Sequence, residues 1–262
     1  MKKHFLSFVS NIKNENPYLK EWLDYHIKVG VDHFYLFNQC ETEESWRILE
    51  PYREKRIVTV HDWTKIDSKY EGPTFFFQKN KNHMGYTHAA TNYRQDTEWL
   101  LKIDLDEFLF MADEQESIKS WLHKLDSDLT RTIRVPRIDF GSNGHKKEPK
   151  GGVLENYTRR EESPSNYKDM ANTDFLNDNK RCYSSHKWSY RWFSGGKIHV
   201  PDPLNELRIH HYYTKSKEEY FDRQNISRGR KVSEEDFKAI EDRTNQVEDR
   251  EILRHLPLST DQ

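Results

Sequence analysis

The chain has 262 residues, with 34% hydrophobic, 13% aromatic and 33% charged residues, and its formal net charge at pH 7 is −2. This length fits one large α/β domain or two small ones, and a single domain is the first expectation. The near-neutral charge and many aromatic side chains argue against a disordered chain, because self-repulsion is small and the rings supply apolar area to bury. The 42 basic residues are spread among 44 acidic ones, which disfavours a nucleic-acid-binding protein.

Short strands and helices alternate over the first hundred residues. The expected elements are a strand at 4–10, a helix from Pro17 to Gly30, a strand at 33–37, a helix at 43–53 and a strand at 56–61. A helix between Pro73 and Gln95 then leads to the apolar "WLLKI" (99–103), which suits a central strand buried on both faces. This alternation favours a parallel sheet covered by helices.

An acidic cluster, Asp104, Asp106 and Glu107, follows this central strand. On an extended strand end, residues two apart point to the same side, so the two aspartates can converge. Close carboxylates repel unless a cation lies between them, and Mg²⁺ or Mn²⁺ held by one or two carboxylates takes substrate phosphates as further ligands. The same acids would also suit a solvated strand end or a helix N-cap. The carboxyl edge of an α/β sheet, where ligands gather, favours a functional role.

The rest of the chain has weaker patterns. A helix is expected near 115–125 and strands near 131–138 and 205–213, with loop-rich chain between the strands. The last segment is strongly charged with scattered apolar residues, which is typical of an exposed helix that packs through one stripe. We therefore expect a main domain over residues 1–230 and a charged helical C-terminal extension over 231–262.

Cysteine content and hydropathy bear on the compartment. Cys40 and Cys182 are far apart and lack the paired spacing of a zinc or redox motif, so a reducing compartment is the simplest account, with one disulfide left open. The first residues contain an apolar run too short for a signal peptide, and no apolar stretch reaches the roughly 18 residues of a membrane span. The sequence predicts a cytoplasmic protein without a transmembrane segment, either free or peripheral to a membrane.

Several sequence blocks together indicate one family. They are "KNENPYLKEWLDYHIKVGVDHFYLFN" (13–38), "TEWLLKIDLDEFL" (97–109), "FGSNGH" (140–145), "ENYTRR" (155–160), "HKWSYR" (186–191) and "IHHYYTKSKEEY" (209–220). Through them the chain resembles a GT-A glycosyltransferase of glycosyltransferase family 92, in the neighbourhood of family 2. The resemblance implies a Rossmann-like α/β fold with a mostly parallel central sheet flanked by helices. It also implies transfer of a hexose, with inversion, from a nucleotide-sugar, most simply a UDP-sugar, to a glycan hydroxyl.

The resemblance also implies a divalent metal, Mn²⁺ or Mg²⁺, at the acidic cluster. Asp106 would be a direct ligand, Asp104 would lie near the donor ribose or reach the metal through water, and Glu107 would support the loop. His211 matches a late histidine that completes the metal shell. His210 is the alternative, and because neighbours on a strand point to opposite faces, only one of the two should reach the site.

The donor side is expected to involve seven residues: Lys13, Asn14, Glu15, Gln78, Asp104, Lys215 and Arg228. Lys215 and Arg228 would offset the charge of the departing diphosphate. Four of these residues have a structural alternative. Glu15 could cap the helix that follows it, Gln78 and the nearby His88 could pack in the core, and the two basic residues could be ordinary solvated side chains.

The acceptor side and the catalytic base are the least specified part. Inverting transfer needs a base for the acceptor hydroxyl, and Asp139 is our candidate, with Glu155 as the other possibility. His145, beside two glycines of "FGSNGH", and Trp188 are expected to bind the acceptor, with Trp192 as a second platform for a sugar ring. Tryptophans in such a pattern are also common in cores.

Two other functions remain open at this stage. A haloacid dehalogenase-type phosphohydrolase also has Asp-x-Asp after a strand, but that motif lies near the chain start, whereas here it lies at mid-chain and is followed by Glu107 and Phe108. A non-catalytic carbohydrate-binding protein on the same fold would keep the sheet and lose turnover.

Overall fold

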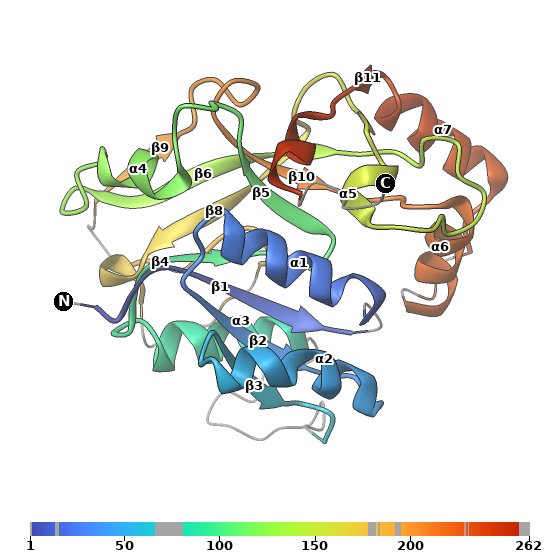
Figure 1. Cartoon of the computed structure of the whole chain (residues 1–262). Helices are drawn as coiled ribbons and strands as arrows, with labels where there is room; N and C mark the ends of the chain where they lie inside the picture. The colour runs from blue at the N-terminus through green and yellow to red at the C-terminus, as the bar shows by residue number, and fades with distance from the viewer. Residues whose placement is uncertain are drawn as a thin grey trace, which may run out of the picture.

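The computed structural model describes residues 2–13, 16–65, 81–177, 182, 184–191, 195–227, 229 and 231–256. In this part of the chain, nine strands form one sheet, with β3-β2-β1-β4-β8-β6-β10-β5 in spatial order and β9 paired with β6 (Figure 1). The predicted α/β class is confirmed, and the sheet is mixed: one half is parallel and the other contains antiparallel pairs.

The parallel half carries the first helices. Its elements are β1 (His4–Ile12), α1 (Asn16–Lys28), β2 (His33–Asn38), α2 (Glu43–Glu54), β3 (Val58–Asp62), α3 (Lys81–Asn92) and β4 (Thr97–Lys102). Alternate residues of the strands join two different clusters, because successive side chains on a strand point to opposite faces. Phe8 and Phe34 pack with Trp22 of α1, whereas Val9 and Tyr35 share a cluster with Tyr86 of α3. Both faces are therefore covered, as the apolar strands predicted.

The other half of the sheet was only partly predicted. It contains β5 (Glu107–Met111), β6 (Thr130–Asp139), β8 (Asn166–Asn172), β9 (Gly196–His199) and β10 (Leu207–His211), and α4 (Ile118–His123) lies between β5 and β6. The strands expected near 131–138 and 205–213 correspond to β6 and β10. Strands β5, β8 and β9 were not predicted. Strand β8 runs antiparallel to both β4 and β6 and so joins the two halves.

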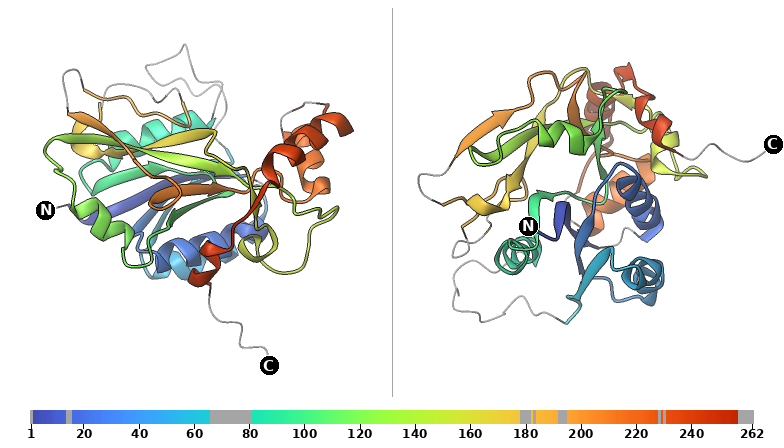
Figure 2. Two further views of the ribbon diagram at one scale, coloured as in Figure 1. Left: turned by 90° about the horizontal axis from the view of Figure 1, so that it is seen from above. Right: turned by 60° about the vertical axis from the view of Figure 1, so that its left-hand side comes forward.

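Several short elements complete the structure between residues 153 and 255. They are α5 (Val153–Asn156), β7 (Arg159–Arg160), a 3₁₀ turn (Thr173–Phe175), α6 (Lys217–Asp222), a π-helical turn (Arg223–Ser227), α7 (Glu234–Thr244), β11 (Val247–Glu248) and a final 3₁₀ turn (Glu251–His255). Figure 2 shows α6 and α7 together, and Tyr220 packs on Phe237 between them. After α7 the chain returns to the body, where β11 pairs with β7.

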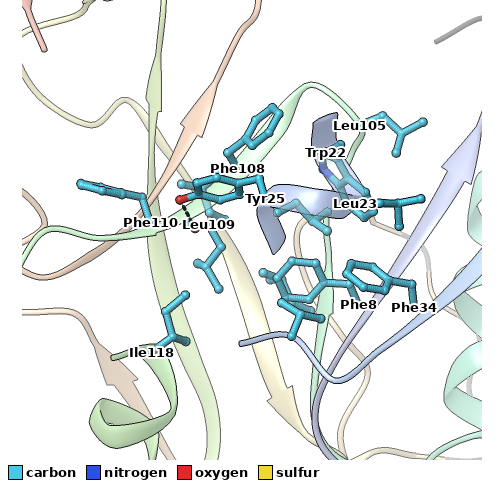
Figure 3. Packing of buried hydrophobic residues seen from close by; sticks show 14 of the residues in the cluster. Phe8, Trp22, Leu23, Tyr25, Phe34, Leu105, Phe108, Leu109, Phe110 and Ile118 are labelled. Atoms are coloured by element: carbon cyan, nitrogen blue, oxygen red, sulfur yellow. Dashed lines mark hydrogen bonds between the residues drawn. The ribbon is translucent and has the colours of Figure 1, made fainter. Parts of the chain in front are cut away.

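The largest cluster of buried side chains lies between α1 and the sheet (Figure 3). Tyr25 packs edge-on against Phe108, and its hydroxyl donates to the Leu109 carbonyl 3.0 Å away. Trp22 similarly donates its ring N–H to the carbonyl of Glu107. Helix α1 is thus fixed to the first residues of β5, directly after the acidic cluster.

Two findings bear on the compartment. No disulfide joins Cys40 and Cys182, which are buried in different clusters. Among the described residues, none of the helices combines the length and apolar character needed to span a bilayer.

Candidate active site

Asp104 and Asp106 lie in a tight turn between β4 and β5 and not on an extended strand end, as the sequence had suggested. The turn forms because β5 begins at Glu107 and pairs with β10, so the chain must change direction within a few residues. The Glu107 N–H donates to the Asp104 carbonyl at 3.0 Å, and the Glu107 carboxylate accepts the Asp104 N–H at 2.9 Å. The N–H of Tyr212, the residue after β10, donates to the Asp106 carbonyl at 2.8 Å.

A buried lysine, Lys168 of β8, neutralises the first aspartate. Its ammonium lies 2.8 Å from Asp104 Oδ2 and also pairs with Glu107. Burial raises the pKa of Asp104, but the charge of Lys168 more than offsets this, so the pKa lies below its usual value. Burial lowers the pKa of Lys168, and its two acidic partners raise it above its ordinary value. Lys168 could not be identified from the sequence, since a single lysine in "NYKDMAN" has no local pattern.

The second aspartate, Asp106, is 1% exposed and contacts two basic side chains. Arg223 Nη1 lies 2.6 Å from its Oδ2, and His211 Nε2 lies 3.5 Å from the same oxygen. Burial raises the pKa of Asp106, but Arg223 and then His211 hold it well below its usual range. Within the described part of the chain, its other oxygen, Oδ1, is buried without a hydrogen-bond partner.

Asp139 lies behind His211 in the neighbouring strand. Residues 139 and 211 are paired in the parallel register of β6 and β10, and His211 Nδ1 lies 2.7 Å from Asp139 Oδ1. The second oxygen of Asp139 accepts from Arg243 of α7 at 2.9 Å. Burial raises the pKa of Asp139, but His211 and its other cationic partners lower it below the usual value. With both oxygens engaged and 4% exposure, Asp139 is poorly placed for the predicted role of base.

His210 points to the opposite face of β10. It is fully buried, packs on the rings of Phe110 and Phe140, and accepts a hydrogen bond from Arg208 Nε at 2.9 Å. Of the two adjacent histidines, only His211 faces the acidic turn. The alternation of a strand accounts for this difference.

A pocket of about 410 Å³ opens above the acidic turn. It is lined by Asn11, Lys13, Asn82, Asp104, Asp106, Arg137, Ser185, His186, His211, Tyr213 and Arg223. Four of these residues, Lys13, Asp104, Asp106 and His211, were predicted from the sequence. The others come from the end of β1, from α3, from β6 and from the segments around 186 and 213–223, which the topology brings to one edge of the sheet.

Besides Asp139 and His210, several predicted site residues lie away from the pocket lining. Lys215 is 8% exposed, with its ammonium 3.9 Å from the ring centre of Tyr18. Trp188 is buried in the α3 cluster under Lys102, so its face is not available to a sugar. The carboxylate of Glu155 accepts the Gly152 N–H at the start of α5.

His145 packs edge-on against Tyr157. The "FGSNGH" turn beside it packs closely on another part of the chain and not on a ligand, because a side chain at Gly141 would collide with Asn245, which follows α7. The predicted Asn14, Glu15, Gln78, Trp192 and Arg228 lie outside the described residues. His88, the weaker donor-side candidate, packs edge-on against Phe37 and His61.

The described residues contain no cluster of three or more His, Cys, Asp or Glu side chains placed to hold a metal. Two of the lining residues nevertheless offer donor atoms, namely Asp106, whose Oδ1 is buried without a hydrogen-bond partner, and His211. Carboxylate oxygen and imidazole nitrogen both suit Mn²⁺, and a cation bound by few protein ligands is completed by substrate oxygens. The residues present therefore fit a divalent ion that binds together with an anionic substrate.

Comparison with known proteins identifies the family. The model of "Glycosyltransferase family 92" matches residues 9–250. The chain belongs to glycosyltransferase family 92. It is 27% identical over 186 residues to a family 92 protein of Oryza sativa subsp. japonica and 24% identical over 183 residues to one of Arabidopsis thaliana. These matches cover 67% and 66% of this chain but 28% and 30% of the relatives.

A further similarity is to galactan beta-1,4-galactosyltransferase GALS2 of Arabidopsis thaliana, at 28% identity over 118 residues, which covers 44% of this chain and 21% of that protein. The matched region thus spans less than a third of the length of these family 92 relatives. The matched region of the family model includes the acidic turn, β10 and the residues that line the pocket.

Proposed function

We propose that the chain is the GT-A catalytic domain of a metal-dependent glycosyltransferase that moves a hexose, with inversion, from a UDP-sugar to a hydroxyl of a glycan. Its family and the galactosyltransferase relatives support the reaction class. The observation that carries the proposal is the buried, unsatisfied oxygen of Asp106, which lies beside His211 in the wall of the pocket. Such an oxygen is costly to keep without a partner.

Asp106 and His211 would hold the metal, with Asp104 near the donor ribose. When bound, the ion would supply Lewis-acid stabilisation to the diphosphate. Asp139 would keep the His211 ring in place, since a carboxylate behind a ligating histidine fixes its tautomer and orientation. Lys168 would hold Asp104 ionised and fixed.

The pocket also supplies positive charge of its own. Lys13, Arg137 and Arg223 line it, and a guanidinium suits phosphate oxygens because it donates in a fixed fork. We assign Arg223 the largest part in stabilising the leaving nucleotide, because it already lies against Asp106. Lys215 acts from a distance, since its charge contributes to the low pKa of Asp106.

The test combines binding with turnover. UDP affinity is measured by calorimetry with and without Mn²⁺, and UDP release from UDP-galactose and UDP-glucose is followed with a galactan oligosaccharide as first acceptor. In Asp106→Asn we expect Mn²⁺-dependent UDP binding to be lost and turnover to fall by about 10²–10³-fold, the effect typical of removing one group that stabilises developing charge.

Asp113→Asn, on the surface after β5, is the matched control and should behave as wild type. Turnover that is unchanged in Asp106→Asn would contradict the proposal. Tight sugar binding with neither transfer nor donor hydrolysis in the wild type would favour the carbohydrate-binding alternative.

A further inference from the structure

The segment around His186 occupies a sheet edge that β4 leaves open. The pairing of β4 with β8 ends at Leu101 and Met170, where β4 turns away into the acidic turn. Beyond that point the N–H of Asp169, on β8, donates to the His186 carbonyl at 2.8 Å. This hydrogen bond holds His186 next to the turn that carries Asp104 and Asp106, and its side chain lines the same pocket.

The hydrogen bond of the His186 ring defines its tautomer. Nδ1 lies 2.8 Å from the backbone carbonyl oxygen of Tyr167. A carbonyl oxygen can only accept, so Nδ1 carries the hydrogen and Nε2 of the neutral ring carries a lone pair. Among the described residues, none forms a hydrogen bond with Nε2. The pocket is therefore lined by an oriented imidazole with an available acceptor nitrogen.

The other side chains of the pocket lining that could accept a proton are already paired with a neighbouring group. Asp104 pairs with Lys168, and Asp106 pairs with Arg223. His211 is held between Asp106 and Asp139. Every carboxylate among the described lining residues is thus neutralised by a cation, and a carboxylate with a lowered pKa is a weak base. His186 is the remaining lining residue that can accept a proton at neutral pH.

We propose that His186 is the general base of the transfer, an inference that rests on the proposed function. Its Nε2 takes the proton of the acceptor hydroxyl while the acceptor oxygen forms a bond to the anomeric carbon. The bond from that carbon to the phosphate oxygen breaks, and its electron pair leaves with the nucleotide diphosphate. The imidazolium then releases its proton to solvent. The Tyr167 carbonyl stabilises this imidazolium through Nδ1–H.

The electrostatics of the ring agree with this role. Burial lowers the pKa of His186, the hydrogen bond to Tyr167 raises it, Lys168 and Arg137 lower it, and Glu107 raises it. The net pKa lies below the usual value, so the ring is neutral and able to accept a proton at pH 7. A neutral imidazole with a lone pair on Nε2 can accept a proton at the working pH.

The experiment uses His186→Gln and follows UDP release from UDP-galactose and UDP-glucose. We expect kcat to fall by about 10²–10⁴-fold, the range for loss of a general base. The dissociation constant of UDP with Mn²⁺ should stay at the wild-type value, because the groups around Asp106 are untouched. The acid limb of the kcat–pH profile should disappear in the variant, and added imidazole should restore part of the rate in His186→Ala.

His4→Gln is the matched control, since His4 is a partly buried histidine with a pKa lowered by burial, and it lies at the opposite end of the strands. It should keep both the rate and the acid limb. Wild-type kcat in His186→Gln, or a slow variant that retains the acid limb and is not rescued, would overturn the inference. Failure of the wild type to bind UDP and Mn²⁺ would instead overturn the proposed function.

Discussion

The two faces of β10 show how one strand can serve two purposes. His211 faces a pocket, between two carboxylates. His210, the residue before it, faces a closed network in which Arg208 bonds Asp249 and the histidine itself. Burial lowers the pKa of both rings. For His211 the charge of Asp106 reverses the shift and raises the pKa, whereas for His210 the neighbouring Arg208 lowers it further.

The contrast lies in which face meets the pocket, since each face leaves one buried polar atom without a partner, Asp106 Oδ1 on one and His210 Nδ1 on the other. On the His211 side the unpaired atom belongs to a residue that lines the pocket, which is the arrangement of a binding site. On the His210 side, Asp249 is shared by two arginines, Arg208 and Arg160, and none of these residues lines the pocket. The first network is open to a ligand, and the second links β10 to the last turn of the chain.

The largest effect is expected on the closed face. Asp249→Ala leaves Arg208 and Arg160 without their shared carboxylate, and breaking a buried pair in this way costs about 3–5 kcal/mol in the free energy of unfolding. Glu251→Ala removes the half-exposed member of the same network and should cost far less. Urea unfolding measures both. Equal losses in the two variants would show that the network is not closed in the way described.

A smaller effect, on binding, is expected on the open face. His211→Gln should weaken Mn²⁺-dependent UDP binding by about 10–100-fold, the range for disturbing a ligand set and its supporting groups. His210→Gln is the matched control on the same strand, and it should lower stability while leaving UDP affinity unchanged. Calorimetry at a fixed Mn²⁺ concentration measures the UDP affinity of both variants. If both variants lost affinity to the same extent, the division between the faces would be wrong.

The smallest effect concerns His26 of α1, which extends the comparison to a histidine in the core. Its Nδ1 donates to the Trp22 carbonyl and its Nε2 accepts the Leu109 N–H, and burial lowers its pKa to about 3. Below pH 6.5 the unfolded chain binds a proton that the folded chain does not. The contribution of His26 to the free energy of unfolding is fully present above that pH and falls by about 1.4 kcal/mol for each pH unit below it.

Urea unfolding between pH 7 and 5 tests this for His26, with His26→Gln as the comparison. The glutamine amide can donate one hydrogen bond and accept another but does not titrate. The slope of the free energy of unfolding against pH should therefore correspond to one proton fewer in the variant. Identical slopes in the two proteins would contradict the assignment of His26 as a buried neutral ring.

The parallel half of the fold could be predicted because its signals are local. Apolar runs mark β1, β2 and β4, and Pro17 and Gly30 mark the ends of α1. Strand β8 could not be predicted, because Lys168 can be buried in it only when Asp104 and Glu107, far away in sequence, neutralise its charge. A charged residue that is buried only because distant residues neutralise it does not produce the apolar pattern of a strand.

The same distinction between local and long-range signals separates the site residues that could be predicted from those that could not. His211 could be found because it matches a late histidine of the family that the sequence resembles, and the structure brings it to Asp106. His186 and Arg223 could not be found, because one depends on β4 leaving the edge of β8 and the other on a π-helical turn that carries it to the acidic turn. A candidate such as Trp188 failed as a sugar platform because its neighbours, unknown from the sequence, enclose it.

The acidic turn is fixed by the protein alone. Glu107 and the Tyr212 N–H hold its backbone, and Lys168 holds the Asp104 side chain. A substrate that enters therefore meets carboxylates whose directions are already set, and little of its binding free energy is needed to order them. Such preorganisation allows the site to favour the charge distribution of the transition state over that of the bound donor.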